Sequence, residues 1–228
     1  MGASDFSKLP HIGEPVKRKE DYRFLTGAGQ YTDDIALAAQ AHAVFVRSPH
    51  AHARVRSVST DAAKAAPGVI GVLTGADVAA DKINGLPCGW LITSTNGEPM
   101  KEPPHPILAL DTVRYVGDQV AMVVAETLEQ ARDAAELVEV DYDPLPAVVL
   151  VADAAAGSVP GAVVHDIAPD NHCYKWAIGD KAAVDAVFAG AAHVAQLDLV
   201  NNRLIPNAME PRAAIGSYSR ANDEYTLY

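Results

Sequence analysis

Short apolar runs alternate with alanine-rich polar segments along this chain, and that alternation restricts it to a mixed α/β fold. Three segments have the β-branched and aromatic composition of strands: 41–47, 53–59 and 69–73. Between the last two, residues 60–68 predict a short helix, capped by Ser59 or Thr60 and ended by a Pro-Gly pair. A strand, a helix and a strand in so short a stretch indicate a compact α/β unit.

A second unit of this kind follows. Residues 115–125 predict a strand, and Thr127 then begins a helical segment in which Gln130 completes a capping box. Four apolar residues of this segment share one helix face: Leu128, Ala131, Ala135 and Val138. The chain leaves the helix in a further strand, residues 138–146, which prolines 144 and 146 stop. Two such units predict two helices packed on strands.

Irregular sequence separates and follows these units. Residues 84–106 contain several glycines and prolines and little periodicity, so we expect a long surface loop, a kind of segment that is often functional. Residues 148–170 are rich in Ala, Gly, Val and Pro and have the composition of a connecting segment. Both segments therefore join regular elements rather than forming them.

The last part of the chain starts a new pattern. Asp180 caps a predicted helix over residues 181–191, and residues 193–204 alternate as a strand. Two short strands complete the sequence, near 213–218 and 224–228. The sequence stops within a strand pattern, and a strand needs a neighbour to pair with. We therefore expect the second half to be the opening of a larger domain, with its remainder absent or on another polypeptide.

The overall charge narrows the classes of partner. The chain has 29 acidic and 18 basic residues and a formal net charge of −11, which argues against a nucleic-acid surface. No apolar run approaches the roughly 20 residues that a membrane-spanning helix needs, so we expect no membrane insertion. Two cysteines provide neither a disulfide framework nor a CxxC zinc site. These features together predict a cytoplasmic protein.

Two small motifs favour structural interpretations. Gly27-x-Gly29 has neither a preceding strand nor a following helix, so a turn is a better interpretation than a dinucleotide-binding loop. His50 and His52 lie two residues apart, a spacing that lets both face one metal ion. No third ligand is near them in sequence, and two solvent-facing or interface histidines are the simpler account.

Three further residues carry possible chemistry. Cys88 lies in the long loop without a nearby histidine, and adjacency to His172 does not give Cys173 the geometry of a nucleophile. Glu210 precedes a Pro-Arg pair at the start of a predicted strand. It is either a polar group positioned at a pocket or one half of an ion pair with Arg203 or Arg212. The residues alone favour the ion pair.

Several stretches, in order, resemble one known family. RFLTGAGQYTDDI, VRSPHAHARVRSVSTDAAKAAPGVIGVLTGADV and VRYVGDQVAMVVAETLEQARDAAELVEVDYDPLP resemble the α/β hammerhead domain of the xanthine dehydrogenase and aldehyde oxidase family. IGDKAAVDAVFAGAAHVAQ and NAMEPRAAIGSY resemble the start of the molybdopterin-binding domain of that family. The likeness is greatest to bacterial large subunits of the carbon-monoxide-dehydrogenase-like branch. It covers nearly the whole chain.

The resemblance implies an α/β (α+β) architecture in four parts. These are an N-terminal extension (1–20), the hammerhead domain (21–147), a linker (148–170) and the start of a molybdopterin-binding domain (171–228). It also implies a molybdenum hydroxylase large subunit that takes oxygen from water and acts on aldehydes, N-heterocycles or carbon monoxide. The complete subunit would bind molybdenum-molybdopterin cytosine dinucleotide. FAD and 2Fe-2S would lie on medium and small partner subunits, with no cofactor expected on this chain alone.

The family's pterin-binding glycine loop, glutamine-bearing strand and catalytic glutamate would all follow residue 228, so we expect no catalytic residue here. Only Glu210, in MEPR, falls on a family motif near the active-site side. The chain is therefore expected to be inactive alone. One alternative is a free-standing docking subunit that assembles with a separately encoded molybdopterin-binding chain. A further alternative is a small independent enzyme that uses Cys88 or Cys173.

Overall fold

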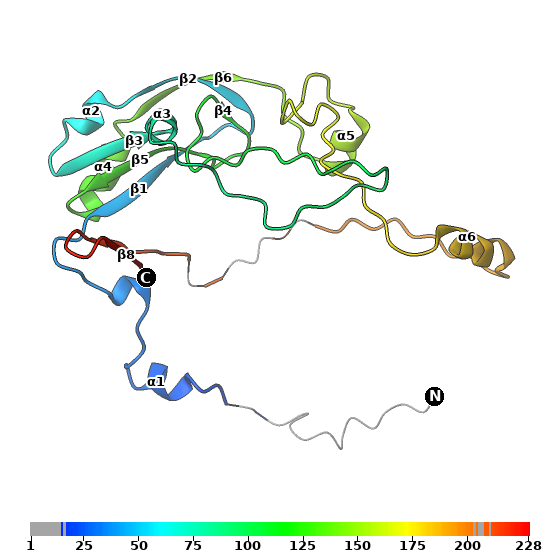
Figure 1. The fold of residues 1–228 in the computed structure, drawn as a ribbon, viewed down its shortest axis with the longest axis horizontal. Coiled ribbons are helices and arrows are strands. Elements are labelled where there is room, and N and C mark those ends of the chain that lie inside the picture. The colour runs from blue at the N-terminus through cyan, green and yellow to red at the C-terminus, as the bar shows by residue number, and fades with distance from the viewer. Residues whose placement is uncertain (1–14, 16, 203, 205–207, 210) are drawn as a thin grey trace. The chain divides into compact units, whose positions relative to one another are not determined.

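The structure, a computed structural model, describes all residues except 1–14, 16, 203, 205–207 and 210. The chain divides into two compact units. The larger comprises residues 39–197, and the smaller combines 1–38 with 198–228. Figure 1 shows the ribbon of the chain, with labels on its elements where there is room.

One antiparallel sheet of the larger unit has the strand order β1-β5-β3. Its strands are β1 (His42–Arg47), β5 (Gln119–Ala125) and β3 (Val69–Thr74). All three predicted strands are confirmed, although β5 begins four residues later than residue 115. Gly117 has a positive φ of 93°, and Arg47 donates a hydrogen bond to its carbonyl oxygen at 2.9 Å, so the chain turns before β5 starts.

The other sheet of this unit has the order β4-β2-β6, also antiparallel. Its strands are β4 (Thr112–Val113), β2 (Ala53–Ser59) and β6 (Glu139–Pro144). The predicted strands at β2 and β6 are confirmed, and β6 ends at its proline as expected. The two-residue strand β4 has no sequence signal of its own, because it forms only by pairing with β2.

Three short helices accompany these strands: α2 (Asp61–Lys64), α3 (Gly75–Ala80) and α4 (Leu128–Ala135). The capping box of α4 is confirmed: the Gln130 backbone N–H donates to Thr127 Oγ1 at 3.2 Å, and the Thr127 N–H donates to Gln130 Oε1 at 3.0 Å. Thr60 occupies the N-cap of α2 but makes no side-chain cap hydrogen bond there. The helix α3 was not predicted from the sequence.

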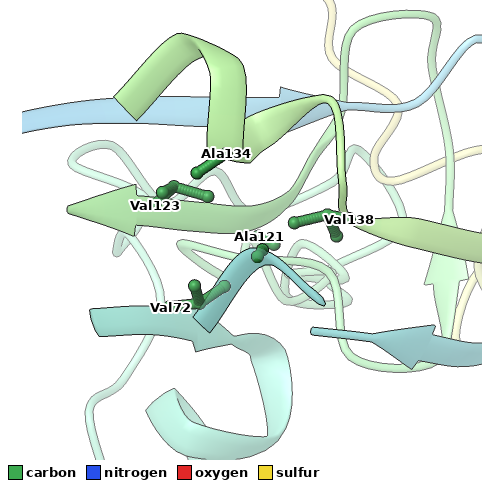
Figure 2. Packing of buried hydrophobic residues seen from close by; sticks show 6 residues of the cluster. Val72, Ala121, Val123, Ala134 and Val138 are labelled. Atoms are coloured by element: carbon green, nitrogen blue, oxygen red, sulfur yellow. The ribbon is translucent and has the colours of Figure 1, made fainter. Parts of the chain in front are cut away.

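The apolar faces of these elements meet in one core. A cluster of small residues from both strands and helices fills it: Ala63, Val72, Ala121, Val123, Ala134 and Val138. Figure 2 shows how Val72, Ala121, Val123, Ala134 and Val138 lie in this cluster. A second cluster, around Val113 and Val120, packs against the same Val58 and Val140 as the first. The two sheets therefore share a continuous core, in which each buried valine contributes roughly 1.5–3 kcal/mol.

The long loop is confirmed, because between residues 84 and 106 the structure shows only an isolated bridge, between Thr93 and Pro99. The Thr95 N–H donates to the Lys175 carbonyl oxygen at 2.8 Å, and the Lys101 N–H to that of Cys173 at 2.9 Å. The connecting segment contains one helix that was not predicted, α5 (Val151–Ala156). Hydrogen bonds from distant residues thus hold the loop in place.

The helix α6 (Lys181–Gly190) confirms its prediction, and the Ala183 N–H donates to the Asp180 cap at 2.9 Å. The strand predicted for 193–204 is wrong for the residues that the structure describes there. Residues 193–202 are exposed and pair with no described strand. Alternating apolar residues do not make a strand without a hydrogen-bonding neighbour.

The smaller unit contains α1 (Asp21–Leu25), the 3-10 helix η2 (Thr32–Asp34) and a hairpin of β7 (Gly216–Ser219) with β8 (Glu224–Leu227). The rings of Tyr218 and Tyr225 lie 4.6 Å apart across the hairpin. The two short strands predicted near the end of the sequence are confirmed.

Candidate functional site

The residue predicted to lie near an active site is not among those described. Glu210 and Arg203 both lie outside the described residues, while Arg212 is exposed. The two interpretations of Glu210, a positioned pocket group or half of an ion pair, both stay predictions.

The two histidines of the SPHAHA segment have separate environments. His52 is buried, and its Nδ1 lies 2.7 Å from the carbonyl oxygen of Pro146. The His50 ring packs against Tyr142, with the ring centroids 4.9 Å apart. His52 is therefore not solvent-facing, while the alternative of an interface histidine stays a prediction. Within the described part of the chain, no three His, Cys, Asp or Glu side chains gather as metal ligands.

Neither cysteine is arranged as a nucleophile. Cys88 is exposed, and its Sγ lies 3.3 Å from the Trp90 carbonyl oxygen. His172 directs Nδ1 to the carbonyl oxygen of Asp170, at 2.8 Å, rather than to the neighbouring Cys173. Among the described contacts no cysteine is hydrogen-bonded to a histidine, so nothing activates either thiol.

The Gly27-x-Gly29 motif is the predicted turn. It follows α1, Gly27 has a φ of 74°, and the Ala28 N–H donates to the Arg23 carbonyl oxygen at 2.9 Å. A β-carbon on Gly29 would collide with the Phe24 ring. These glycines therefore close a turn against a side chain.

The larger unit contains a polar cavity of about 450 Å³ that the sequence analysis did not identify. Its lining comes from four separate stretches of the chain: His52, Arg54, Asp111, Thr112, Arg114, Leu145, Gly161, Val163, Val164 and Asp166. Because these stretches meet through the pairing of β2 with β4 and β6 and through the path of the connecting segment, no local motif marks the cavity.

Arg114 fixes one wall of this cavity. Its Nε donates to the Val164 carbonyl oxygen at 3.0 Å, and its Nη1 donates to the Thr112 carbonyl oxygen at 3.1 Å. Asn171 holds the same wall, since its side-chain nitrogen donates to Ala162 O and its oxygen accepts from the Val164 N–H. The connecting segment is thereby attached to the edge of the β4-β2-β6 sheet.

One histidine beside the cavity is electrostatically perturbed. Burial lowers the pKa of His165 below its ordinary value, and the positive charge of Arg114 lowers it further. Asp166 opposes this shift, and His52 adds to it slightly. The imidazole of His165 is therefore neutral at pH 7, and the fixed positive charges of the cavity come from its arginines.

A second, smaller cavity of about 290 Å³ lies within the long loop, between residues 85–87 and 102–106. The Leu86 N–H donates to the His105 carbonyl oxygen at 2.9 Å, and the Cys88 N–H donates to Glu102 at 2.8 Å. Four prolines line it, so it offers few polar groups to a ligand.

In the part of the chain that the structure describes, no helix is long and apolar enough to cross a membrane.

Solved relatives share this fold. CO dehydrogenase from Oligotropha carboxidovorans superimposes with a TM-score of 0.77 at 36% identity, over 93% of this chain and 26% of that chain. Quinoline 2-oxidoreductase from Pseudomonas putida gives 0.72 at 33% identity, over 95% and 26%. The α/β hammerhead architecture predicted from the sequence is therefore confirmed.

Curated relatives are large subunits. The carbon monoxide dehydrogenase large chain of Afipia carboxidovorans is 36% identical over 97% of this chain and 27% of its own length. The nicotine 6-hydroxylase large subunit of Paenarthrobacter nicotinovorans is also 36% identical, over 95% and 25%. This chain spans about a quarter of the length of these relatives.

Two family descriptions account for most of the sequence. Residues 164–228 match the molybdopterin cofactor-binding domain, and residues 26–146 match the aldehyde oxidase and xanthine dehydrogenase a/b hammerhead domain. The second match alone covers more than half of the 228 residues. The chain belongs to the aldehyde oxidase and xanthine dehydrogenase family of molybdenum hydroxylase large subunits.

Proposed function

We propose that this chain forms the hammerhead part, and the start of the cofactor-binding part, of a molybdenum-dependent hydroxylase or dehydrogenase. The observation that carries the proposal is the match of residues 164–228 to the molybdopterin cofactor-binding domain, directly after the hammerhead match. The holoenzyme would take oxygen from water and oxidise an aldehyde, an N-heterocycle or carbon monoxide. The molybdenum cofactor would supply that chemistry, while the protein orients it.

The described residues do not by themselves form a binding site for this cofactor. A pterin dinucleotide requires an enclosing pocket, yet no described residue from 174 to 228 is buried. We therefore propose that this chain is inactive alone. The core of small apolar residues in the hammerhead supports a scaffolding role for that part.

The proposal also covers the form of the cofactor and the identity of the partner subunits. The cofactor would be molybdenum-molybdopterin cytosine dinucleotide, held by the complete subunit, with Glu210 near the active site. An FAD-binding medium subunit and a 2Fe-2S small subunit would carry the electrons away. The names of the relatives, as a large chain and a large subunit, support membership of such an assembly. A cytoplasmic location and the absence of nucleic-acid partners stay predictions.

The proposed division of the chain keeps four parts: an extension (1–20), the hammerhead domain (21–147), a linker (148–170) and the start of the cofactor-binding domain (171–228). The two family matches, over 26–146 and 164–228, support this order. The alternative function is a docking subunit that assembles with a separately encoded catalytic chain. The firm packing of the hammerhead and the exposure of the later residues are compatible with it.

Purification from a host that makes the molybdenum cofactor tests the proposal. The chain alone should contain no stoichiometric molybdenum or pterin, and should not reduce a dye with carbon monoxide, aldehydes or purines. Co-purification with its partners should bring molybdenum, flavin and iron together with turnover. Turnover by the isolated chain would contradict the proposal. If changing Cys88 and Cys173 to alanine then abolished that turnover, the result would favour a small independent enzyme that uses a thiol.

The reading frame after Tyr228 separates the two assembly hypotheses. Continuation into a glutamine-containing strand and a glycine-rich loop would favour a single large subunit. A stop codon, with a neighbouring gene that encodes those motifs, would favour the docking subunit.

A further inference from the structure

The polar cavity lies on the face of the β4-β2-β6 sheet that is turned away from the core. In the register, Ala53 pairs with Val113, and Arg54 pairs with Thr112. Ala53 and Val113 are fully buried in the core. Because successive side chains of a strand point to opposite faces, Arg54 and Thr112 point to the other face, where both line the cavity.

Three exposed residues of the cavity lining carry charged side chains. Arg54, Asp111 and Asp166 line it, and none of their side chains makes a hydrogen bond or an ion pair with the described part of the chain. The neighbouring pair behaves differently, since Arg56 reaches Asp143 at 3.1 Å. The cavity therefore presents one guanidinium and two carboxylates that are free to bind a ligand.

His52 adds a fixed hydrogen-bonding atom. A carbonyl oxygen can only accept, so the 2.7 Å contact with the Pro146 oxygen requires a proton on Nδ1 of His52. Its Nε2 is the ring nitrogen left for a ligand, on a residue that is only 9% exposed. Four charged residues line the cavity together with His52: Arg54 and Arg114 are positive, and Asp111 and Asp166 are negative.

The charges of the lining balance. Two arginines and two aspartates sum to zero, and the neutral His165 beside them adds nothing at pH 7. A simple anion would meet the two carboxylates, and a simple cation would meet the two guanidinium groups. A ligand that carries both charges can satisfy each group with its opposite. The cavity volume lies within the range of small-ligand sites.

We propose that this cavity binds a zwitterionic ligand, with its carboxylate on Arg54 and its cationic group between Asp111 and Asp166. Arg114 and Asn171 are the positioning residues, because they hold the wall that carries Asp166. Such a ligand is either a free amino-acid-like solute or a polypeptide segment in which a basic and an acidic side chain are adjacent. The shared chemistry is a paired guanidinium or ammonium group and carboxylate.

Titration of the whole chain with free L-arginine tests this site. The histidine side-chain resonances in NMR spectra monitor the titration. We expect a saturable shift of the His52 resonances, which Arg54→Gln and Asp166→Asn each weaken about tenfold, since each removes a charge-assisted contact. Arg56→Gln is the matched control, because Arg56 already has a partner and lies outside the lining. Guanidinium chloride and sodium acetate at equal concentration should give no saturable shift.

A second measurement distinguishes the two sources of the ligand. If a polypeptide segment fills the cavity, assembly with partner chains should abolish L-arginine binding, and Arg54→Gln should weaken assembly. If the ligand is a free solute, L-arginine should still bind to the assembled complex. The proposal is overturned if L-arginine gives no saturable shift, or if its affinity is equal in the wild type and both cavity variants. None of these readouts requires molybdenum, so failure here is distinct from failure of the proposed function.

Discussion

The helices α4 and α6 start in the same way and end in different environments. Each has an N-cap side chain, Thr127 in α4 and Asp180 in α6, that accepts a backbone hydrogen bond. Yet Ala131 and Ala134 of α4 are completely buried, whereas Phe188 of α6 is 58% exposed. A helix cap is a local contact, and burial depends on what the rest of the molecule brings to the helix.

The same contrast holds for the strands around these helices. Val120 and Val123 of β5 have neighbours on both sides, because β5 is the central strand of its sheet. The apolar residues between 193 and 202 alternate as well as those of many strands, but in the described structure they have no paired neighbour. The comparison predicts that stability is concentrated in the hammerhead core and that substitutions in α6 leave it unchanged.

Truncation of a core valine should have the largest effect. Val123→Ala removes two methyl groups from a fully buried position and should lower the free energy of unfolding by about 2.5 kcal/mol. Val187→Ala in α6, at a side chain 73% exposed, should change it by less than about 0.5 kcal/mol. Urea unfolding of both variants provides the measurement. Equal losses for the two would show that α6 is packed as firmly as β5.

Two glycines differ in the space around them, one in the hammerhead core and one in α6. A β-carbon on Gly75 would collide with the carbonyl oxygen of Ala109, which is held by an Ala109 N–H bond to Gln119 at 2.7 Å. Gly75→Ala should therefore destabilise the chain by about 2 kcal/mol. Gly190 has open space around it, so Gly190→Ala should not destabilise, and should increase helicity. Thermal unfolding by circular dichroism distinguishes the two, and an unchanged midpoint for Gly75→Ala would refute the close contact.

The two caps should have unequal consequences for the whole molecule. Thr127→Ala removes the cap of a packed helix and should reduce the free energy of unfolding by about 1 kcal/mol. Asp180→Ala should increase amide hydrogen exchange within α6 while leaving global unfolding unchanged, because no residue of α6 is buried. A drop in global stability for Asp180→Ala would mean that α6 belongs to the cooperative core.

Local sequence patterns predicted the helices and strands that depend on nearby residues, but not those that depend on distant parts of the chain. The capping box at Thr127 and the cap at Asp180 marked both helices, since capping depends on residues three apart. The helix α3 was not predicted because it follows strand β3 directly, and the last residue of that strand, Thr74, is also the N-cap of the helix. The two-residue strand β4 could not be predicted, as it exists only by pairing with β2.

The candidate sites show the same limit. Adjacency in sequence does not bring Cys173 and His172 into a hydrogen bond, and the spacing of His50 and His52 did not reveal that the second is buried. The cavity joins residues such as Arg54 and Asp166, which are more than a hundred positions apart, so only the folded chain brings them together. Sequence patterns identified the family through several motifs in order, rather than through any one site.

The smallest predicted effect is on the pH dependence of stability, to which Asp77 of α3 should contribute and Asp185 of α6 should not. Hydrogen bonds from the Thr74 hydroxyl and backbone N–H, both 2.7 Å long, lower the pKa of Asp77 below its usual 3.8. A carboxylate whose folded-state pKa is depressed stabilises the fold above the unfolded pKa, and that contribution is lost as the pH falls below about 4.

Asp77→Asn does not titrate, so the loss of stability between about pH 5 and pH 3 should be smaller than in the wild type. The control is Asp185→Asn, which removes a carboxylate paired with Lys181 on exposed α6 and should leave the pH dependence of global unfolding as it is. Urea unfolding at each pH provides the measurement. Identical slopes for the wild type and Asp77→Asn would show that the α3 cap does not couple to the core. A flatter slope for Asp185→Asn would instead place α6 within the cooperative unit, and the contrast between the two helices would no longer hold.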